Sequence, residues 1–125
     1  DINKVSILCY LQPRDGIGWH VDGNCYRGSR WVGILTVREN TQSATSKLQM
    51  WQDRQLRTLE RADMENTLVL FRADQIKHRV LPMAEGETRI VVNFIFTDDP
   101  RPSTNPLKAF YRRCVNLFFY GSFTR

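Results

Sequence analysis

The feature that most constrains the fold is the division of the chain into short segments of alternating residues. In the most regular segment, 88–97, one face is wholly apolar and the other mixes polar and apolar side chains. A period of two is typical of a strand whose two faces meet different surroundings. Turn-forming runs such as Pro13-Arg14-Asp15-Gly16 separate such segments. Further strands are expected at 5–11, 19–21, 31–37, 48–51, 67–71 and 78–81. Many short strands with frequent turns favour a β-sandwich or barrel, the jelly roll included.

The remaining segments are connectors and one helix. A polar break is expected over 39–46, and the charged stretch 52–66 could hold a hairpin, a short helical turn or both. Asn105 and Pro106 provide an N-cap and a first helical residue near the C-terminus. The apolar stripe expected on that helix consists of Leu107, Phe110, Tyr111, Cys114 and Val115.

The length of the chain sets the number of domains. With 125 residues, 42% of them hydrophobic, it can form one packed core but not two. We therefore expect residues 1–125 to form a single domain. Because the first residue is not Met, N-terminal elements of the domain are expected to lie outside this chain. No apolar run reaches the roughly 18 to 20 residues that span a bilayer, so no membrane association is expected.

The net charge and the cysteine content indicate which binding partners and which cellular compartment to expect. The net charge is +5, but the basic residues are spread along the chain, which favours a solvated surface over a nucleic-acid footprint. A functional basic patch would suit a polyanionic or acidic substrate. The three cysteines form no CxxC pair and are odd in number, which argues against a disulfide framework or a zinc site. A reducing, intracellular (cytoplasmic) compartment is favoured.

The only two histidines, together with one carboxylate, suggest a metal site. His20 and Asp22 are two residues apart, so in an extended chain their side chains lie on one face, roughly 7 Å apart. With His78 they would form the two-histidine, one-carboxylate facial triad of non-haem Fe(II) oxygenases, which leaves coordination positions open. A His-x-Asp pair alone arises often by chance. The order of the further motifs gives the pattern its specificity.

Arg89 stands at the head of the strongest expected strand, on the face opposite the apolar one. A guanidinium directed into the interior must meet an anion, because an unpaired buried charge is very costly. The distal carboxylate of 2-oxoglutarate, bound bidentately, would satisfy it. A structural ion pair with one of the 13 acidic residues is the alternative.

Three runs of sequence carry a family resemblance. They are Cys9-Tyr10 followed after nine residues by His20-Val21-Asp22, then 68–71 followed after six residues by His78, then 89–94. In this order they resemble the prolyl 4-hydroxylase-like branch of the 2-oxoglutarate/Fe(II)-dependent dioxygenases, and are similar to the catalytic domains of the hypoxia-sensing prolyl hydroxylases. The resemblance covers roughly residues 4–99.

The resemblance implies a mainly β, double-stranded β-helix (jelly-roll, cupin-like) core, with iron at its open end. His20, Asp22 and His78 match the iron ligands and therefore the catalytic centre, and Arg89 matches the residue that pairs with the 2-oxoglutarate C5 carboxylate. Tyr10 matches a co-substrate tyrosine, and Asn93 lies where the family often has a hydroxyl-bearing contact. Thr36 stands where a second co-substrate tyrosine is common. The implied cofactors are Fe(II), 2-oxoglutarate and O₂, with ascorbate as a possible addition.

The implied reaction is hydroxylation of an unactivated C–H bond, coupled to oxidative decarboxylation of 2-oxoglutarate. Asp22 favours hydroxylation, because related halogenases have Gly or Ala at that position. A peptidyl, prolyl-type side chain is the preferred substrate, although Thr36 and Ile95 depart from the family pattern near the site. A free amino acid or small metabolite is the first alternative.

Two further alternatives differ more strongly from hydroxylation of a peptide or an amino acid. A nucleic-acid demethylase typically carries a second arginine where this chain has Ile95, so a nucleic-acid partner is unlikely. A non-catalytic cupin-like binding module would not need Arg89 aligned with a complete triad. Substrate identity and oligomeric state do not follow from the sequence.

Overall fold

The structure is a computed structural model and describes residues 4–110 and 114. Within these residues it contains eight strands, a one-turn 3-10 helix and a helical turn at 106–110. The strands are β1 (Lys4–Tyr10), β2 (Ile17–His20), β3 (Arg30–Asn40), β4 (Thr45–Gln52), β5 (Gln55–Glu60), β6 (Leu68–Arg72), β7 (Lys77–Val80) and β8 (Thr88–Thr97), and the 3-10 helix is η1 (Arg61–Asp63).

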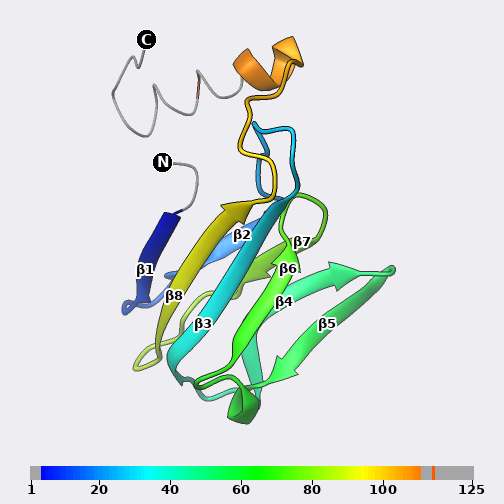
Figure 1. Cartoon of the computed structure of the whole chain (residues 1–125). Coiled ribbons are helices and arrows are strands. Elements are labelled where there is room, and N and C mark those ends of the chain that lie inside the picture. The colour runs from blue at the N-terminus through cyan, green and yellow to red at the C-terminus, as the bar shows by residue number, and fades with distance from the viewer. Residues whose placement is uncertain (1–3, 111–113, 115–125) are drawn as a thin grey trace.

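These strands form two antiparallel sheets that face each other. The first sheet has the order β1-β8-β3-β6 and the second the order β2-β7-β4-β5. In Figure 1 the first sheet lies across the front, β2 and β7 lie behind it, and the β4–β5 hairpin extends to one side. Because most neighbours are not consecutive in sequence, the chain crosses repeatedly between the sheets, as in a jelly roll. The predicted mainly β, jelly-roll class is therefore confirmed.

The predicted element boundaries hold in part. The stretch 52–66 contains both a hairpin strand, β5, and a helical turn, η1, as one of the predictions had it. The polar break expected over 39–46 was wrong in extent, because β3 runs on to Asn40 and β4 already begins at Thr45. The error matters, because Glu39 is one of the most deeply buried side chains of the molecule.

A bulge in β3 explains why Glu39 points inward. Its pairing with β8 shifts register between Thr36 and Arg38, so one extra residue, the exposed Val37, enters this strand. A bulge reverses the inside-outside alternation beyond it. Thr36 and Glu39, an odd number of residues apart, therefore both face the interior and are at most 1% exposed.

The core lies between the sheets, and the outer face of the first sheet is apolar. Apolar side chains from both sheets fill the interior, among them Val32, Leu48, Phe71, Val80 and Val91. Val5 and Ile7 on β1, and Leu68 and Leu70 on β6, remain more than half exposed on the outer face. An exposed apolar face of this size marks a surface that other protein can cover.

The predicted helix begins where expected. The Asn105 side-chain oxygen accepts a hydrogen bond from the Leu107 backbone N–H at 2.9 Å, which is an N-cap, and Pro106 opens the helix. Leu107 and Phe110 from the expected stripe are 77% and 68% exposed, whereas Tyr111 and Val115 lie outside the described residues. Among the described residues, no helix has the length and apolar content needed to cross a membrane.

The loop between β2 and β3 is bonded closely to the segment after β8. Backbone bonds join Arg27 to Arg101 and Gly28 to Asp99, and the Ser29 N–H donates to the Asp98 carboxylate. The two segments are so close at Gly28 that an added Cβ would overlap the Asp98 side chain and the Asp99 backbone nitrogen. This packing fixes the far end of the loop that begins at Asp22.

We expect Gly28→Ala to lower the free energy of unfolding by about 1–3 kcal/mol, because the new methyl group overpacks this contact. Gly18→Ala is the matched control, since a Cβ there meets nothing within 4 Å. Chemical denaturation of both variants measures the difference. Equal stability of the two variants would contradict the close approach at Gly28.

Candidate metal centre

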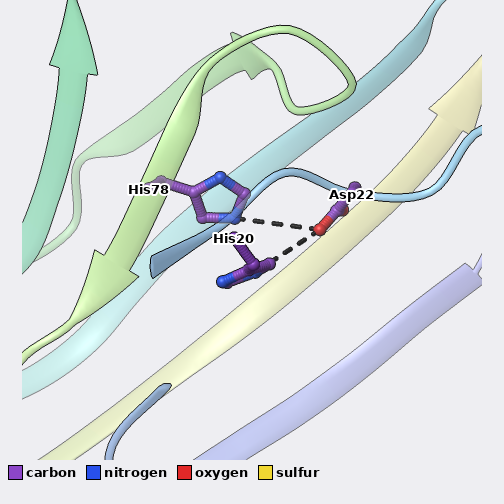
Figure 2. A group of neighbouring side chains, drawn as sticks. All are labelled: His20, Asp22 and His78. Atoms are coloured by element: carbon purple, nitrogen blue, oxygen red, sulfur yellow. Dashed lines mark ion pairs between the residues drawn. The ribbon is translucent and has the colours of Figure 1, made fainter. Parts of the chain in front are cut away.

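Two neighbouring strands of the second sheet bring the histidines together. His20 ends β2 and is the direct cross-strand partner of His78 on β7. Directly opposed residues of an antiparallel pair point to the same side of the sheet, so both rings face the space between the sheets. Their ring centroids are 4.1 Å apart. Figure 2 shows the two imidazoles and the Asp22 carboxylate pointing toward one another.

The distances between these side chains are those of groups that can share one ion. Asp22 Oδ1 lies 3.5 Å from His20 Nε2 and 3.8 Å from His78 Nε2. One ligand atom from each residue lies within 4.8 Å of the others. With metal–ligand bonds of about 2.1 Å, adjacent ligands are separated by about 3 Å, so only a small inward shift is needed.

The hydrogen bonds of the two rings determine which nitrogens carry protons. His20 Nδ1 lies 2.8 Å from the Gly18 carbonyl, and His78 Nδ1 lies 3.0 Å from the Ile76 carbonyl. A carbonyl oxygen can only accept, so in both rings Nδ1 carries the hydrogen and donates it. In the neutral ring, Nε2 then carries a lone pair, which is directed at Asp22. Such a backbone contact is the usual way in which a metal-binding histidine is oriented.

Burial favours the neutral form of His78. Its side chain is 8% exposed and packs edge-on against Phe71, with a ring-centroid separation of 4.9 Å. Desolvation lowers the pKa of His78, and the nearby His20 acts in the same direction, although the Ile76 hydrogen bond and the Asp22 carboxylate oppose it. At neutral pH a lone pair is therefore available for a cation.

Arg30 holds the other oxygen of the Asp22 carboxylate. Arg30 Nε lies 3.4 Å from Asp22 Oδ2, whereas Oδ1 faces the histidines. The same guanidinium donates from Nη1 to the Gly23 carbonyl at 3.0 Å, which fixes it against the loop. Oδ2 is thus within ion-pairing distance of Arg30 without a hydrogen bond to it, and Oδ1 is the oxygen that faces the histidines. The sequence analysis did not identify Arg30.

Asp74 ties this loop to the turn before β7. Its carboxylate accepts hydrogen bonds from the Asn24 side chain, the Arg30 backbone N–H and the Arg72 guanidinium. Desolvation opposes ionisation, but these three donors outweigh it and lower the pKa of Asp74. The Asp22 N–H also donates to the Ala73 carbonyl at 2.8 Å. The turn that precedes His78 thus positions Asp22 as well.

Arg89 forms a buried ion pair. From the sequence, its partner could have been any of the acidic residues. Arg89 lies directly opposite Glu39 on β3 and directly opposite Tyr10 on β1. Its Nε donates to Glu39 Oε2 at 3.1 Å, and its guanidinium carbon lies 5.7 Å from the centre of the Tyr10 ring. Glu39 also accepts from the Ser46 hydroxyl and the Lys47 N–H. The alternative of a structural ion pair is therefore realised, and Glu39 is a residue that the analysis missed.

The pair with Glu39 does not use all of Arg89. Its Nη2 is buried without a hydrogen-bond partner, and so are Thr36 Oγ1 and Asn93 Oδ1. Thr36 lies opposite Val91 and Asn93 opposite Ile34, on the inward face that β3 and β8 share with Arg89. Buried polar atoms without partners are rare and call for a ligand or water. A carboxylate can accept hydrogen bonds from Arg89 Nη2 and the Thr36 hydroxyl, whereas Asn93 Oδ1 is an acceptor and needs a donor.

The predicted site residues thus lie in two groups. His20, Asp22 and His78 are brought together. Arg89 and Tyr10 are neighbours, and Thr36 and Asn93 share their sheet face. Burial raises the pKa of Tyr10 against the effect of the Arg89 guanidinium, so its hydroxyl remains a hydrogen-bond donor at neutral pH. That these four residues bind 2-oxoglutarate remains a prediction.

Comparison with known proteins supports the fold. The described features define a jelly-roll protein with a His-Asp-His group between its sheets. The chain is similar to a crystal structure of a Pseudomonas putida prolyl-4-hydroxylase, with a TM-score of 0.63 and 22% sequence identity. The match covers 83% of this chain and 54% of that one, so the chain spans about half of that protein's length. At this identity the likeness shows a prolyl-4-hydroxylase-like fold and no more.

No protein-family model matches the sequence, and no curated protein matches it. The chemistry of the site therefore has to be argued from the side chains themselves.

We expect Arg30→Gln to weaken the binding of Mn(II) or Co(II) by about tenfold or more, because residues that orient a ligand contribute on this scale. Arg27→Gln, in the same loop but exposed, is the matched control. Titration calorimetry of the metal-free protein gives both affinities. Unchanged or tighter binding by Arg30→Gln would show that Arg30 acts only as an opposing charge.

Proposed function

We propose that this chain is the catalytic domain of an Fe(II)- and 2-oxoglutarate-dependent dioxygenase that hydroxylates an unactivated C–H bond. The preferred substrate is a peptidyl side chain of the prolyl type. The observation that carries the proposal is the convergence of two imidazole nitrogens and one carboxylate oxygen on a common point. Without a cation or a proton between them, these three electron-rich atoms would repel one another.

The donor set supports iron over the common alternatives. Two imidazole nitrogens and one carboxylate oxygen on one side of an ion are the ligands of non-haem Fe(II) oxygenases, which keep the other positions open. A structural zinc site would instead be closed by four protein ligands, usually with cysteine. None of the described cysteines belongs to the group around Asp22.

Different residues of the chain would have different roles in this reaction. When bound, iron with 2-oxoglutarate and O₂ supplies the oxidising chemistry, in which the co-substrate becomes succinate and CO₂. His20, His78 and Asp22 would hold the iron, and Arg30 would keep Asp22 monodentate. The Arg89 Nη2 donor would bind the distal carboxylate, with the Tyr10 hydroxyl and the Thr36 hydroxyl as further polar contacts.

The substrate preference rests on likeness and is the finer part of the proposal. The similar structure is a prolyl-4-hydroxylase, and the motif order of this chain also resembles that branch. Iron and 2-oxoglutarate chemistry would be common to peptide and free amino-acid hydroxylation. A peptide screen and an amino-acid screen, both read as a mass gain of one oxygen atom, separate the two.

The first test of the proposal is succinate formation. The wild type should release succinate only when Fe(II), 2-oxoglutarate and O₂ are all present, and Asp22→Ala and His78→Ala should lose this activity at least a hundredfold through loss of iron binding. Glu85→Ala, which removes an exposed carboxylate, is the control and should retain it. A folded Asp22→Ala variant with full activity would refute the ligand assignment, and a wild type inactive toward every candidate substrate would refute the enzyme proposal.

The second test separates the two roles of Arg89. Arg89→Gln alone leaves Glu39 buried and unpaired, which should destabilise the fold by about 3–5 kcal/mol. The double variant Glu39→Gln/Arg89→Gln removes both charges and should fold, yet its Mn(II)-loaded form should bind 2-oxoglutarate at least tenfold more weakly because the carboxylate loses a charged donor. Glu39→Gln alone also loses stability, because Arg89 is then buried without its counter-ion, but its folded fraction keeps the guanidinium and should bind 2-oxoglutarate as tightly as the wild type or more tightly. If the double variant binds normally, Arg89 is purely structural.

A further inference from the structure

The outer face of the second sheet carries a hollow that the proposed reaction does not use. Trp19, Trp51 and Lys77 line it, and its volume is about 260 Å³. Lys77 and Arg79 flank the inward-pointing His78 on β7, so the pleat of the strand directs them to the opposite, outer face. The sheet therefore separates this hollow from the His-Asp-His group.

The register of the strands builds the hollow from three strands, with a fourth strand, β5, beside it. Trp51 on β4 lies directly opposite Lys77 on β7 and directly opposite Leu56 on β5. Trp19 comes from β2, on the other side of β7. The Lys77 ammonium group thus lies between the indoles of Trp19 and Trp51, whose strands flank β7. Leu56 lies beyond Trp51. Trp51 and Leu56 are 48% and 47% exposed.

Arg79 holds one wall of the hollow in place. Its guanidinium lies 4.5 Å from the centre of the Trp19 ring, and its Nε donates to Gln49 Oε1 at 2.8 Å. Lys77 Nζ lies 5.8 Å from the same ring. A cation stacked on an aromatic ring restrains both groups. The Trp19 wall is therefore pre-ordered, which reduces the entropy that a ligand loses on binding.

Within residues 4–110 and Cys114, the two cations of this face have no anionic partner. Among the described residues, no carboxylate lies within ion-pairing distance of Lys77 or Arg79. Other cations in the described residues, such as Lys47 and Arg101, do have one. The face therefore combines exposed apolar rings with unneutralised positive charge.

We propose that this face docks an acidic peptide segment that carries a large apolar side chain. The apolar side chain would enter the hollow between Trp19 and Trp51, and flanking carboxylates would pair with Lys77 and Arg79. Trp and Arg are the residues most enriched among those that dominate the energy of protein interfaces. The exposed Leu56 extends the apolar contact in a way that suits a peptide better than a phosphate backbone. A segment bound here lies on the opposite side of the sheet from the metal centre, so this binding does not depend on the proposed reaction.

The test uses a short fluorescein-labelled peptide in which Asp and Glu flank one Leu-Phe pair. Three probes accompany it: the same peptide with Lys in place of the acids, the same peptide with Ser in place of Leu and Phe, and labelled oligo(dT). Fluorescence anisotropy should show saturable binding of the first peptide alone, and the binding should weaken as salt is added. Trp51→Ala and Lys77→Glu should each raise the Kd about tenfold or more.

Matched controls separate a specific face from general attraction to a basic protein. Lys108→Glu changes the net charge by the same amount at another exposed position, and Leu70→Ala removes an exposed apolar side chain from the first sheet. Both should bind the peptide as the wild type does. Three results would each overturn the proposal: no binding of the acidic peptide, equal binding by Trp51→Ala and Lys77→Glu, or retention of oligo(dT) in its place. Unfolding curves of the variants confirm that each is folded.

Discussion

The pairing of β2 with β7 is the constraint on which the rest of the site depends. It makes His20 the cross-strand partner of His78, and two backbone carbonyls then set both Nε2 lone pairs toward Asp22. The same strands carry Trp19 and Lys77 on their other face. One register thus creates a candidate metal centre on the inside of the sheet and an aromatic, cationic hollow on the outside.

The second polar group depends on a single inserted residue. The bulge at Val37 turns Glu39 inward, where it meets Arg89 across the strand pair. Without that bulge the guanidinium would be buried alone, at a cost that a small domain could not tolerate. The pair makes Arg89 compatible with folding before any ligand binds. Its unpartnered Nη2, together with Thr36 and Asn93, leaves the interior able to accept a further polar molecule.

The sequence predicted the features that depend on order and spacing. The strand-rich architecture followed from the alternation, and the His20, Asp22 and His78 group followed from an ordered set of motifs. Features that depend on the register of the strands could not be predicted from the sequence. Strict alternation would place Glu39 outside, because it cannot reveal a bulge. In β1 the face that carries Val5 and Ile7 points away from the core, which the alternation along the strand cannot decide.

Long-range contacts account for the remaining omissions. Arg30 and Asp74 belong to no recognisable motif, and only the meeting of two loops shows that Arg30 pairs with the Asp22 carboxylate while Asp74 accepts a hydrogen bond from the Arg30 backbone. The outer hollow joins residues from three strands, so the basic side chains of β7 lie beside indoles that are distant from them in sequence.

The most direct test of the central claim is X-ray absorption spectroscopy of the protein loaded with one equivalent of Fe(II) under anaerobic conditions. The account predicts a first shell of nitrogen and oxygen atoms at about 2.0–2.2 Å, with the multiple scattering of two imidazoles. His78→Ala, which is expected to lose iron binding, should not give that imidazole signal. A spectrum with one imidazole or none in the wild type would contradict the account, because the two lone pairs would then not converge on the metal.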